Sequence, residues 1–254
     1  MAKKYIVGNW KMNPQTLSDA DKLFKKIKKT APLYKNVKTI LCPPYIYLSE
    51  FLLTYSGKRI LFGAQDSSSE SRGAFTGEIS PDQLVDIGAD YVILGHSERR
   101  SQGETNKIVN KKIKAAIGAG LNVILCVGEE IRDDRGEYLV FLKHEIGESL
   151  HGIGKEKLSK IIVAYEPVWA IGGGAHTAMS AHELYQMKLY IHKILNELYG
   201  ELGMSVTIIY GGSSSPETTE ELIQEGKVDG LLVGNQSLLP ESFLEIIKIT
   251  NSIK

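Results

Sequence analysis

The sequence has few of the features that mark secreted, membrane-spanning or nucleic-acid-binding proteins. It contains 2 cysteines among 254 residues, and its 30 basic and 30 acidic side chains give a formal net charge of zero. No apolar run reaches the roughly 18 residues that a membrane-spanning helix needs. A balanced charge also provides no general attraction to nucleic acid or to an anionic membrane surface. We therefore expect no nucleic-acid partner and no membrane partner.

The two cysteines are too far apart in the sequence to form a redox or metal-binding motif. Cys42 and Cys126 both lie inside apolar, strand-like runs. Buried free thiols in a reducing compartment explain this placement better than a disulfide does. The N-terminal residues enter a strand-like run directly, without a signal-type apolar stretch. These features predict a cytoplasmic protein, and they supply no metal site.

Short apolar runs recur along the chain and predict a barrel. Each run is nearly continuous in hydrophobic residues, which is typical of strands that are buried on both faces. The eight runs lie at 5–10, 38–42, 60–65, 91–95, 122–127, 161–166, 206–210 and 228–233. Eight strands that alternate with helices favour an α/β protein with one domain over residues 1–254, a closed (β/α)8 TIM barrel. The rival is an open doubly wound sheet, but the turn after the first run lacks the GxGxxG pattern typical of that fold.

Helical periodicity is visible between the runs. The apolar residues that share one helical face are Leu17, Ala20, Phe24 and Ile27; Ile108, Val109, Ile113 and Ala116; and Leu184, Met187, Ile191, Ile194 and Leu198. Ser180 and Glu183 have the spacing of a capping box at the start of the third stripe.

Polar residues follow several runs at the point where each run ends. In a (β/α)8 barrel the carboxyl ends of the strands carry the active site. The residues found there are Asn9 and Lys11 at the end of the first run, His96 after the fourth, Glu166 at the end of the sixth, Gly211-Gly212-Ser213 after the seventh and Gly234-Asn235 after the eighth. A cation, an imidazole and a carboxylate should therefore meet on one face, beside glycine-rich turns that can bind phosphate.

Most of these residues, taken singly, have an ordinary structural explanation. A strand-end lysine such as Lys11 is usually a solvated charge, and a Gly-Gly pair is usually a tight turn. Glu166 is harder to explain in that way, because a carboxylate that directly continues a buried strand loses solvation energy. The meeting of all these groups on one rim favours a catalytic site.

The segment after Glu166 has the composition of a stiff hinge and a loop that can cover a site. Pro167 restricts the backbone, apolar residues follow, and three consecutive glycines come last. The predicted lid consists of Pro167, Val168, Trp169, Ala170, Ile171, Gly172, Gly173, Gly174, Ala175, His176, Thr177 and Ala178.

Longer motifs through the whole chain resemble the triosephosphate isomerase family. They are Asn9-Trp10-Lys11-Met12-Asn13, Gly73 to Ser80, Gly95-His96-Ser97-Glu98-Arg99-Arg100, Cys126-Val127-Gly128-Glu129, Ala164 to Gly172 and Tyr210-Gly211-Gly212-Ser213. The resemblance implies an isomerase that interconverts D-glyceraldehyde 3-phosphate and dihydroxyacetone phosphate in glycolysis and gluconeogenesis. The proton transfer would pass through an enediolate and need no metal or cofactor.

The same resemblance implies roles for individual residues. Glu166 would be the base, His96 a neutral electrophile, Lys11 a cation for enediolate and phosphate, and Asn9 a group that fixes polar geometry. The phosphate would bind the backbone amides of Gly172, Ser213, Gly234 and Asn235. Glu98 and Cys126 would support the reacting groups from behind. A homodimer would form through Phe75, Thr76, Gly77, Glu78 and Arg99, with Arg99 paired to Glu78 and Thr76 near the neighbour's Lys11.

The chain departs from the family pattern in a few places. Its lid ends Gly172-Gly173-Gly174-Ala175-His176-Thr177-Ala178, one residue longer than the usual Gly-Thr-Gly-Lys-Thr-Ala and without the lysine. We expect slower or less complete closure of this lid, because the extra glycine raises the entropy cost of ordering it. Asn235 replaces a glycine, and Asp66 stands where asparagine is common. The segment after Arg100 is about one residue short, so Glu104 is expected to sit differently.

Two other functions are compatible with this fold. One is a different phosphate-binding TIM-barrel enzyme such as an aldolase, but no run places a lysine for a Schiff base at the end of a mid-barrel strand. The other is a non-catalytic binding protein, since a fold does not imply a function. The intact set of Lys11, His96 and Glu166 argues against a mere scaffold.

Overall fold

A closed, parallel barrel forms the centre of the molecule in the computed structural model, which describes residues 3–170 and 179–253. Each strand pairs in parallel with the next one in sequence, and β1 pairs with β8. The strands are β1 (Lys4–Asn9), β2 (Val37–Cys42), β3 (Ile60–Ala64), β4 (Tyr91–Leu94), β5 (Asn122–Val127), β6 (Ile161–Tyr165), β7 (Thr207–Tyr210) and β8 (Gly230–Val233). The barrel predicted from eight apolar runs is therefore confirmed.

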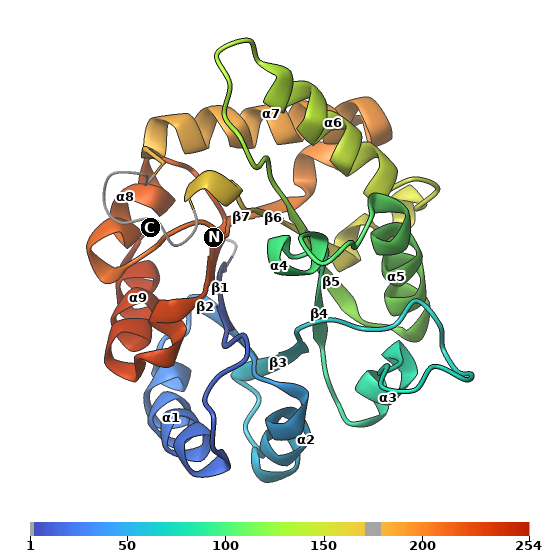
Figure 1. The fold of residues 1–254 in the computed structure, drawn as a ribbon. Helices are drawn as coiled ribbons and strands as arrows, with labels where there is room; N and C mark the ends of the chain where they lie inside the picture. The colour runs from blue at the N-terminus through green and yellow to red at the C-terminus, as the bar shows by residue number, and fades with distance from the viewer. Residues whose placement is uncertain (1–2, 171–178, 254) are drawn as a thin grey trace.

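Helices surround the barrel as an outer layer (Figure 1). They are α1 (Leu17–Thr30), α2 (Tyr45–Thr54), α3 (Pro81–Asp86), α5 (Asn106–Ala119), α6 (Glu137–Ser149), α7 (Ala181–Tyr199), α8 (Pro216–Gln224) and α9 (Pro240–Ser252). The short α4 (Ser97–Arg100) lies inside this ring, over the barrel. The last helix lies beside the first, where Lys26 Nζ is 2.6 Å from Glu241 Oε1. The ring of helices thus closes together with the ring of strands.

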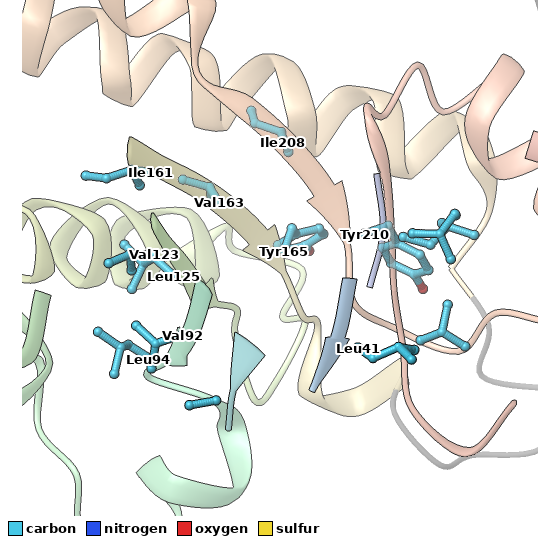
Figure 2. Close-up of a cluster of buried hydrophobic side chains, with 14 of the residues drawn as sticks. Leu41, Val92, Leu94, Val123, Leu125, Ile161, Val163, Tyr165, Ile208 and Tyr210 are labelled. Carbon is cyan, nitrogen blue, oxygen red and sulfur yellow. The ribbon is translucent and has the colours of Figure 1, made fainter. Parts of the chain in front are cut away.

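Alternate residues of each strand face opposite sides of the barrel wall, and this produces two apolar cores. The inner core contains Ile40, Ile93 and Ile124. The outer core lies between the strands and the helices and contains their sequence neighbours Leu94 and Leu125. Figure 2 shows part of the outer core. Because both faces of every strand are covered, the strands read in the sequence as continuous apolar runs.

The predicted helical stripes are buried in their central turns and exposed at their ends. Leu17, Ile108 and Leu198 are 46%, 40% and 46% exposed. Each of these three residues lies in the first or last turn of its helix. The capping box of Ser180 and Glu183 is present at the start of α7.

Two further expectations concern the thiols and membrane spans. Cys42 and Cys126 are both free and buried, as predicted. Within residues 3–170 and 179–253, no helix combines the length and apolarity needed to cross a bilayer.

Candidate active site

A cavity of about 180 Å³ lies at the carboxyl ends of the strands. Its walls come from the ends of β1, β4, β6, β7 and β8, and the lining residues are Asn9, Lys11, His96, Glu166, Gly211, Gly212, Ser213, Ser214, Leu232, Gly234, Asn235 and Gln236. The structure therefore brings together the predicted reacting and phosphate-binding residues that it describes. Gly172 was also predicted here, and it lies outside the described residues.

Glu166 directly continues β6 and is only 2% exposed. Its backbone N–H donates to the carbonyl oxygen of Val127 at 2.8 Å. Glycines at two neighbouring positions leave room for it: a Cβ at Gly128 would lie 2.0 Å from the Glu166 carbonyl oxygen, and a Cβ at Gly211 would lie 2.5 Å from Glu166 Cγ. Sequence reasoning missed these two contacts, since a glycine after a strand usually signals only a turn.

His96 lies at the start of α4 and shares the cavity with Glu166. Its Nδ1 accepts a hydrogen bond from the backbone N–H of Glu98 at 3.2 Å. Since an acceptor nitrogen carries no proton, this contact assigns the neutral tautomer with the proton on Nε2. Nε2 is 3.5 Å from Glu166 Oε1. An N–H donor and a buried carboxylate therefore face one another at the same point of the cavity.

Lys11 is held in a backbone conformation that is uncommon for a lysine, with φ of 53°. Such a conformation costs on the order of 1–3 kcal/mol and persists only where the surroundings fix it. Here the Lys11 N–H donates to Asn9 Oδ1 at 3.0 Å, and the Lys11 carbonyl accepts from Gln65 Nε2 at 2.9 Å. These bonds explain the position of Asn9 and direct the ammonium group toward the cavity, where it lies 2.6 Å from Glu98 Oε1.

The turns after β7 and β8 form the opposite wall of the cavity. Among the described residues, no acceptor takes a hydrogen bond from the backbone N–H of Ser213 or Gly234. A Cβ at Gly234 would lie 3.4 Å from Lys11 Cε, so the turn and the lysine are in close contact. Free backbone N–H groups beside a cation make a site for an anion such as a phosphate group.

Comparison with known proteins agrees with this arrangement of groups. A family model described as "Triosephosphate isomerase" matches residues 4–250, nearly the whole chain. The chain belongs to the triosephosphate isomerase family. The resemblance of the sequence motifs to this family is thus confirmed.

Relatives with the name "Triosephosphate isomerase" are similar over almost their full length. The protein of Dictyoglomus thermophilum is 40% identical, over 98% of this chain and 100% of the relative. That of Dehalococcoides mccartyi is 43% identical, over 98% of this chain and 97% of the relative. That of Carboxydothermus hydrogenoformans is 42% identical, over 98% of this chain and 99% of the relative.

Glu98 and Cys126 were predicted to support the reacting groups of this triosephosphate isomerase family member, and both lie close to those groups. Glu98 contacts Lys11, and its Oε2 lies 3.8 Å from His96 Nδ1. Cys126 belongs to the inner core of the barrel. Burial, and then the nearby Glu166 carboxylate, raise the pKa of the Cys126 thiol well above its usual value. Cys126 is therefore a protonated thiol that packs beneath the base.

The first part of the predicted lid is anchored to Glu129, which the sequence analysis placed in a family motif without a role. Trp169 Nε1 donates to Glu129 Oε1 at 3.0 Å, and the Tyr165 hydroxyl donates to the same oxygen at 2.9 Å. Burial, and then Glu129, raise the pKa of Tyr165. Pro167 and Val168 precede Trp169, and Ala170 ends this short helical turn. The remaining lid predictions, Ile171, Gly172, Gly173, Gly174, Ala175, His176, Thr177 and Ala178, lie outside the described residues, and so does the expectation about closure.

The loop between β3 and α3 carries the predicted dimer residues. Phe75, Thr76, Gly77 and Glu78 are all exposed, with Phe75 48% exposed. Within the chain, Arg99 Nη2 lies 2.9 Å from Asp66 Oδ2, and the pairing of Arg99 with Glu78 in a dimer stays a prediction.

Asp66 also joins the cluster that holds Glu104. Lys112 Nζ lies 2.7 Å from Asp66 Oδ1 and also pairs with Glu104. The Glu104 side chain is thereby held in a buried position beside Lys112.

Proposed function

We propose that this chain interconverts D-glyceraldehyde 3-phosphate and dihydroxyacetone phosphate by proton transfer, a step of glycolysis. The observation that carries the proposal is the 3.5 Å approach of His96 Nε2 to the Glu166 carboxylate in a cavity bounded by an anion-binding turn. A base and a proton donor on one side, with a phosphate site on the other, match a small phosphorylated carbonyl compound.

Phosphate binding supplies the first step. The backbone N–H groups of Ser213, Gly234 and Asn235 hold the phosphate, together with Gly172 of the lid, and the Lys11 ammonium neutralises part of its charge. Backbone N–H groups suit this role because they hold a tetrahedral anion in a fixed orientation. The three-carbon chain then extends toward Glu166 and His96.

Proton transfer by Glu166 is the second step. Its carboxylate removes a proton from the carbon next to the carbonyl, and the electrons of that C–H bond move into an enediolate. His96 gives a proton to one oxygen of the enediolate and takes one from the other, and the carboxyl group then returns its proton to the neighbouring carbon, which completes the exchange of aldehyde and ketone. General base catalysis contributes about 10²–10⁴-fold, so the base needs help from groups that stabilise the enediolate.

His96 and Lys11 provide this stabilisation. The His96 Nε2–H donates to the developing oxyanion, while the Lys11 ammonium adds positive charge and Asn9 keeps Lys11 in place. Donors that are already oriented toward a developing charge stabilise it without reorganisation at the moment of reaction. Cys126 and Glu98 keep Glu166, His96 and Lys11 in this arrangement. No step needs a metal ion or an organic cofactor.

The lid of residues 167–178 completes the site by excluding water. A closed lid strengthens the electrostatic contacts inside the cavity and protects the enediolate from loss of its phosphate. The contacts of Trp169 and Val168 with Glu129 support a hinge at this point.

A homodimer is part of the proposal. The exposed loop with Phe75, Thr76, Gly77 and Glu78 offers an apolar tip for a second copy, and Thr76 would reach the neighbour's Lys11. Arg99 supports the root of that loop through Asp66. Sedimentation of the purified chain tests this, and a monomer at micromolar concentration contradicts it. We also expect the enzyme in the cytoplasm, where free thiols such as Cys42 persist; cell fractionation tests that location.

The decisive experiment is a coupled assay of triose phosphate interconversion. The wild-type chain should be active without added metal, and Glu166→Gln should lower kcat by several orders of magnitude because the amide cannot accept the proton. Glu245→Gln on the surface of α9 is the matched control and should leave the rate unchanged. Equal rates for wild type and Glu166→Gln contradict the assignment of the base, and an inactive wild type contradicts the function.

A further inference from the structure

The Arg100 side chain joins the carboxyl ends of two neighbouring strands. Its Nε donates to the carbonyl oxygen of Gly95, just after β4, at 2.7 Å. Its Nη2 donates to the carbonyl oxygen of Cys126, near the end of β5, at 3.3 Å. In a third contact, Nη1 donates to Asn106 Oδ1 at 2.6 Å, and this bond fixes the orientation of the guanidinium plane.

Glu145 completes this arrangement from α6. Its side chain is 2% exposed, and its Oε1 lies 3.2 Å from Arg100 Nε. Its Oε2 accepts the backbone N–H of Gly128 at 2.8 Å. A carboxylate this deeply buried is costly unless it has such partners. The Arg100–Glu145 pair therefore binds the backbone at Gly95, Cys126 and Gly128.

These backbone positions are next to the reacting groups. Gly95 directly precedes His96. Gly128 packs so closely against the Glu166 backbone that a Cβ on Gly128 would lie 2.0 Å from the Glu166 carbonyl oxygen. A shift of either strand end would thus change the distance between His96 Nε2 and Glu166 Oε1.

Side-chain packing alone leaves space in this part of the molecule. A cavity of about 310 Å³ lies beside the pair and extends to Glu166, with Gly95, Arg100, Gly128 and Glu145 in its walls. This cavity opens to the surface beside the exposed Ser101, Glu130 and Phe141, so packed side chains do not cover the neighbouring backbone on that side. Directional bonds from a planar guanidinium can supply the constraint that packing does not.

We propose that Arg100 and Glu145 are positioning residues that set the separation between His96 and Glu166. The proposal rests on the proposed function, because it concerns the geometry of that proton transfer. Neither side chain touches the substrate. The pair acts through Gly95 on the imidazole and through Gly128 on the base, and it keeps both at the distance that the reaction needs.

The test is Arg100→Lys, which keeps the charge and loses the planar set of donors. A misplacement near 1 Å at a reacting group can lower a rate by up to about 10²-fold, so we expect kcat to fall by about 10- to 10²-fold. The KM should stay within about twofold, since the phosphate site is on other strands. Binding of 2-phosphoglycolate, whose carboxylate mimics the enediolate, should weaken in parallel with kcat. Binding of inorganic phosphate should not change.

Glu145→Gln is the second variant and covers the case in which Arg100→Lys does not fold. The amide oxygen can still accept the Gly128 N–H, while the charge that faces Arg100 is lost. We expect the same pattern with a smaller loss of kcat. Lys188→Met is the control, because it breaks another partly buried ion pair, with Asp229, on the far side of the barrel. It should lower stability and leave kcat and 2-phosphoglycolate binding unchanged.

The outcomes separate this proposal from the proposed function. An unchanged kcat in folded Arg100→Lys and Glu145→Gln overturns the positioning role. Equal weakening of inorganic phosphate and 2-phosphoglycolate also overturns it, since it indicates general distortion of the site. An inactive wild type contradicts the proposed function itself, whereas activity that is lost in Glu166→Gln and unaffected in the pair variants contradicts only this inference.

Discussion

The two ends of the barrel use buried charges in opposite ways. At the amino end, Asp90 and Asp229 occupy equivalent places just before β4 and β8. The Asp229 carboxylate accepts the Ile208 N–H at 2.9 Å, and the Asp90 carboxylate accepts the Phe62 N–H at 3.3 Å. Their own carbonyl oxygens accept N–H groups of the strand on the other side, Tyr5 and Asn122. Each aspartate thus bridges three strands.

At the carboxyl end, comparable groups are kept available for a ligand. Glu166 is buried, and its contacts with His96 and Ser97 are 3.5 and 3.4 Å long. Lys11 holds a strained backbone conformation, and the turns after β7 and β8 present N–H groups to a cavity. The amino end therefore uses its charges to join strands, whereas under the proposed function the carboxyl end gives up some stability for chemistry, as the placement of active sites in this fold implies.

The largest effect that separates the two ends is expected for His96→Gln. The glutamine amide cannot place an N–H donor where Nε2 lies, and removing one donor of an oxyanion costs about 10²–10³-fold in kcat. Thermal unfolding should change little, because the ring makes few bonds to the core. Steady-state kinetics and circular dichroism measure both quantities. A large drop in Tm with an unchanged kcat would place His96 among the structural residues instead.

Gly211→Ala tests whether stability and chemistry can be separated at the carboxyl end. The new Cβ would lie 2.5 Å from Glu166 Cγ, so the base must move or the turn must shift. We expect kcat to fall by about 10²-fold and stability to fall by about 1–3 kcal/mol. Gly118→Ala, where a Cβ meets nothing within 4 Å, is the matched control. Wild-type kcat in Gly211→Ala would mean that the base tolerates displacement.

Asp229→Ala is the corresponding change at the amino end. It leaves the Ile208 N–H without its acceptor and Lys188 without its charged partner. A buried donor left unpaired costs about 1–3 kcal/mol, so the midpoint of urea unfolding should fall. The kcat/KM should stay at the wild-type value, because no contact of Asp229 reaches the cavity. A loss of activity in the folded variant would show that the two ends are coupled.

The sequence predicted the barrel and the groups at its carboxyl end for the same physical reason. Strands that are buried on both faces read as apolar runs, and the first polar residue after each run lies at the rim. Asn9, Lys11, His96 and Glu166 could be found in that way without knowledge of the packing.

The bridges between strands could not be predicted from local patterns. Arg100, Glu145 and Gly128 come from three separate segments, and only the fold brings them together. One signal was present: Glu145 lies on the buried stripe of α6 with Leu142, Ile146 and Ser149. A carboxylate on such a stripe indicates a buried partner, although it does not identify which one. The Asp66–Arg99 contact was not predicted either, because its two residues lie in separate segments of the sequence.

The smallest expected effect concerns two carboxyl groups, one at each end, whose pKa values are raised by burial. Burial raises the pKa of Glu145 from 4.5 to about 7. The Arg100 charge and the Gly128 N–H lower this pKa, whereas the charges of Glu129 and Glu166 raise it further. Burial also raises the pKa of Asp90 above its usual 3.8, against the hydrogen bond from Phe62.

The sign of the pH effect follows from proton linkage. An acid with a raised pKa in the folded state binds protons more tightly there than in the unfolded chain, so stability falls as pH rises through the window between the two values. For Glu145 that window runs from 4.5 to about 7. The difference between the Tm of Glu145→Gln and that of wild type should therefore shift in favour of the variant as pH rises through this range. Above the range, this difference should stay constant. For Asp90→Asn the gain should begin near 3.8 and be smaller, since Asp90 is only half-buried. Parallel Tm curves for wild type and both variants between about pH 4 and 8 would contradict burial as the dominant influence at either end.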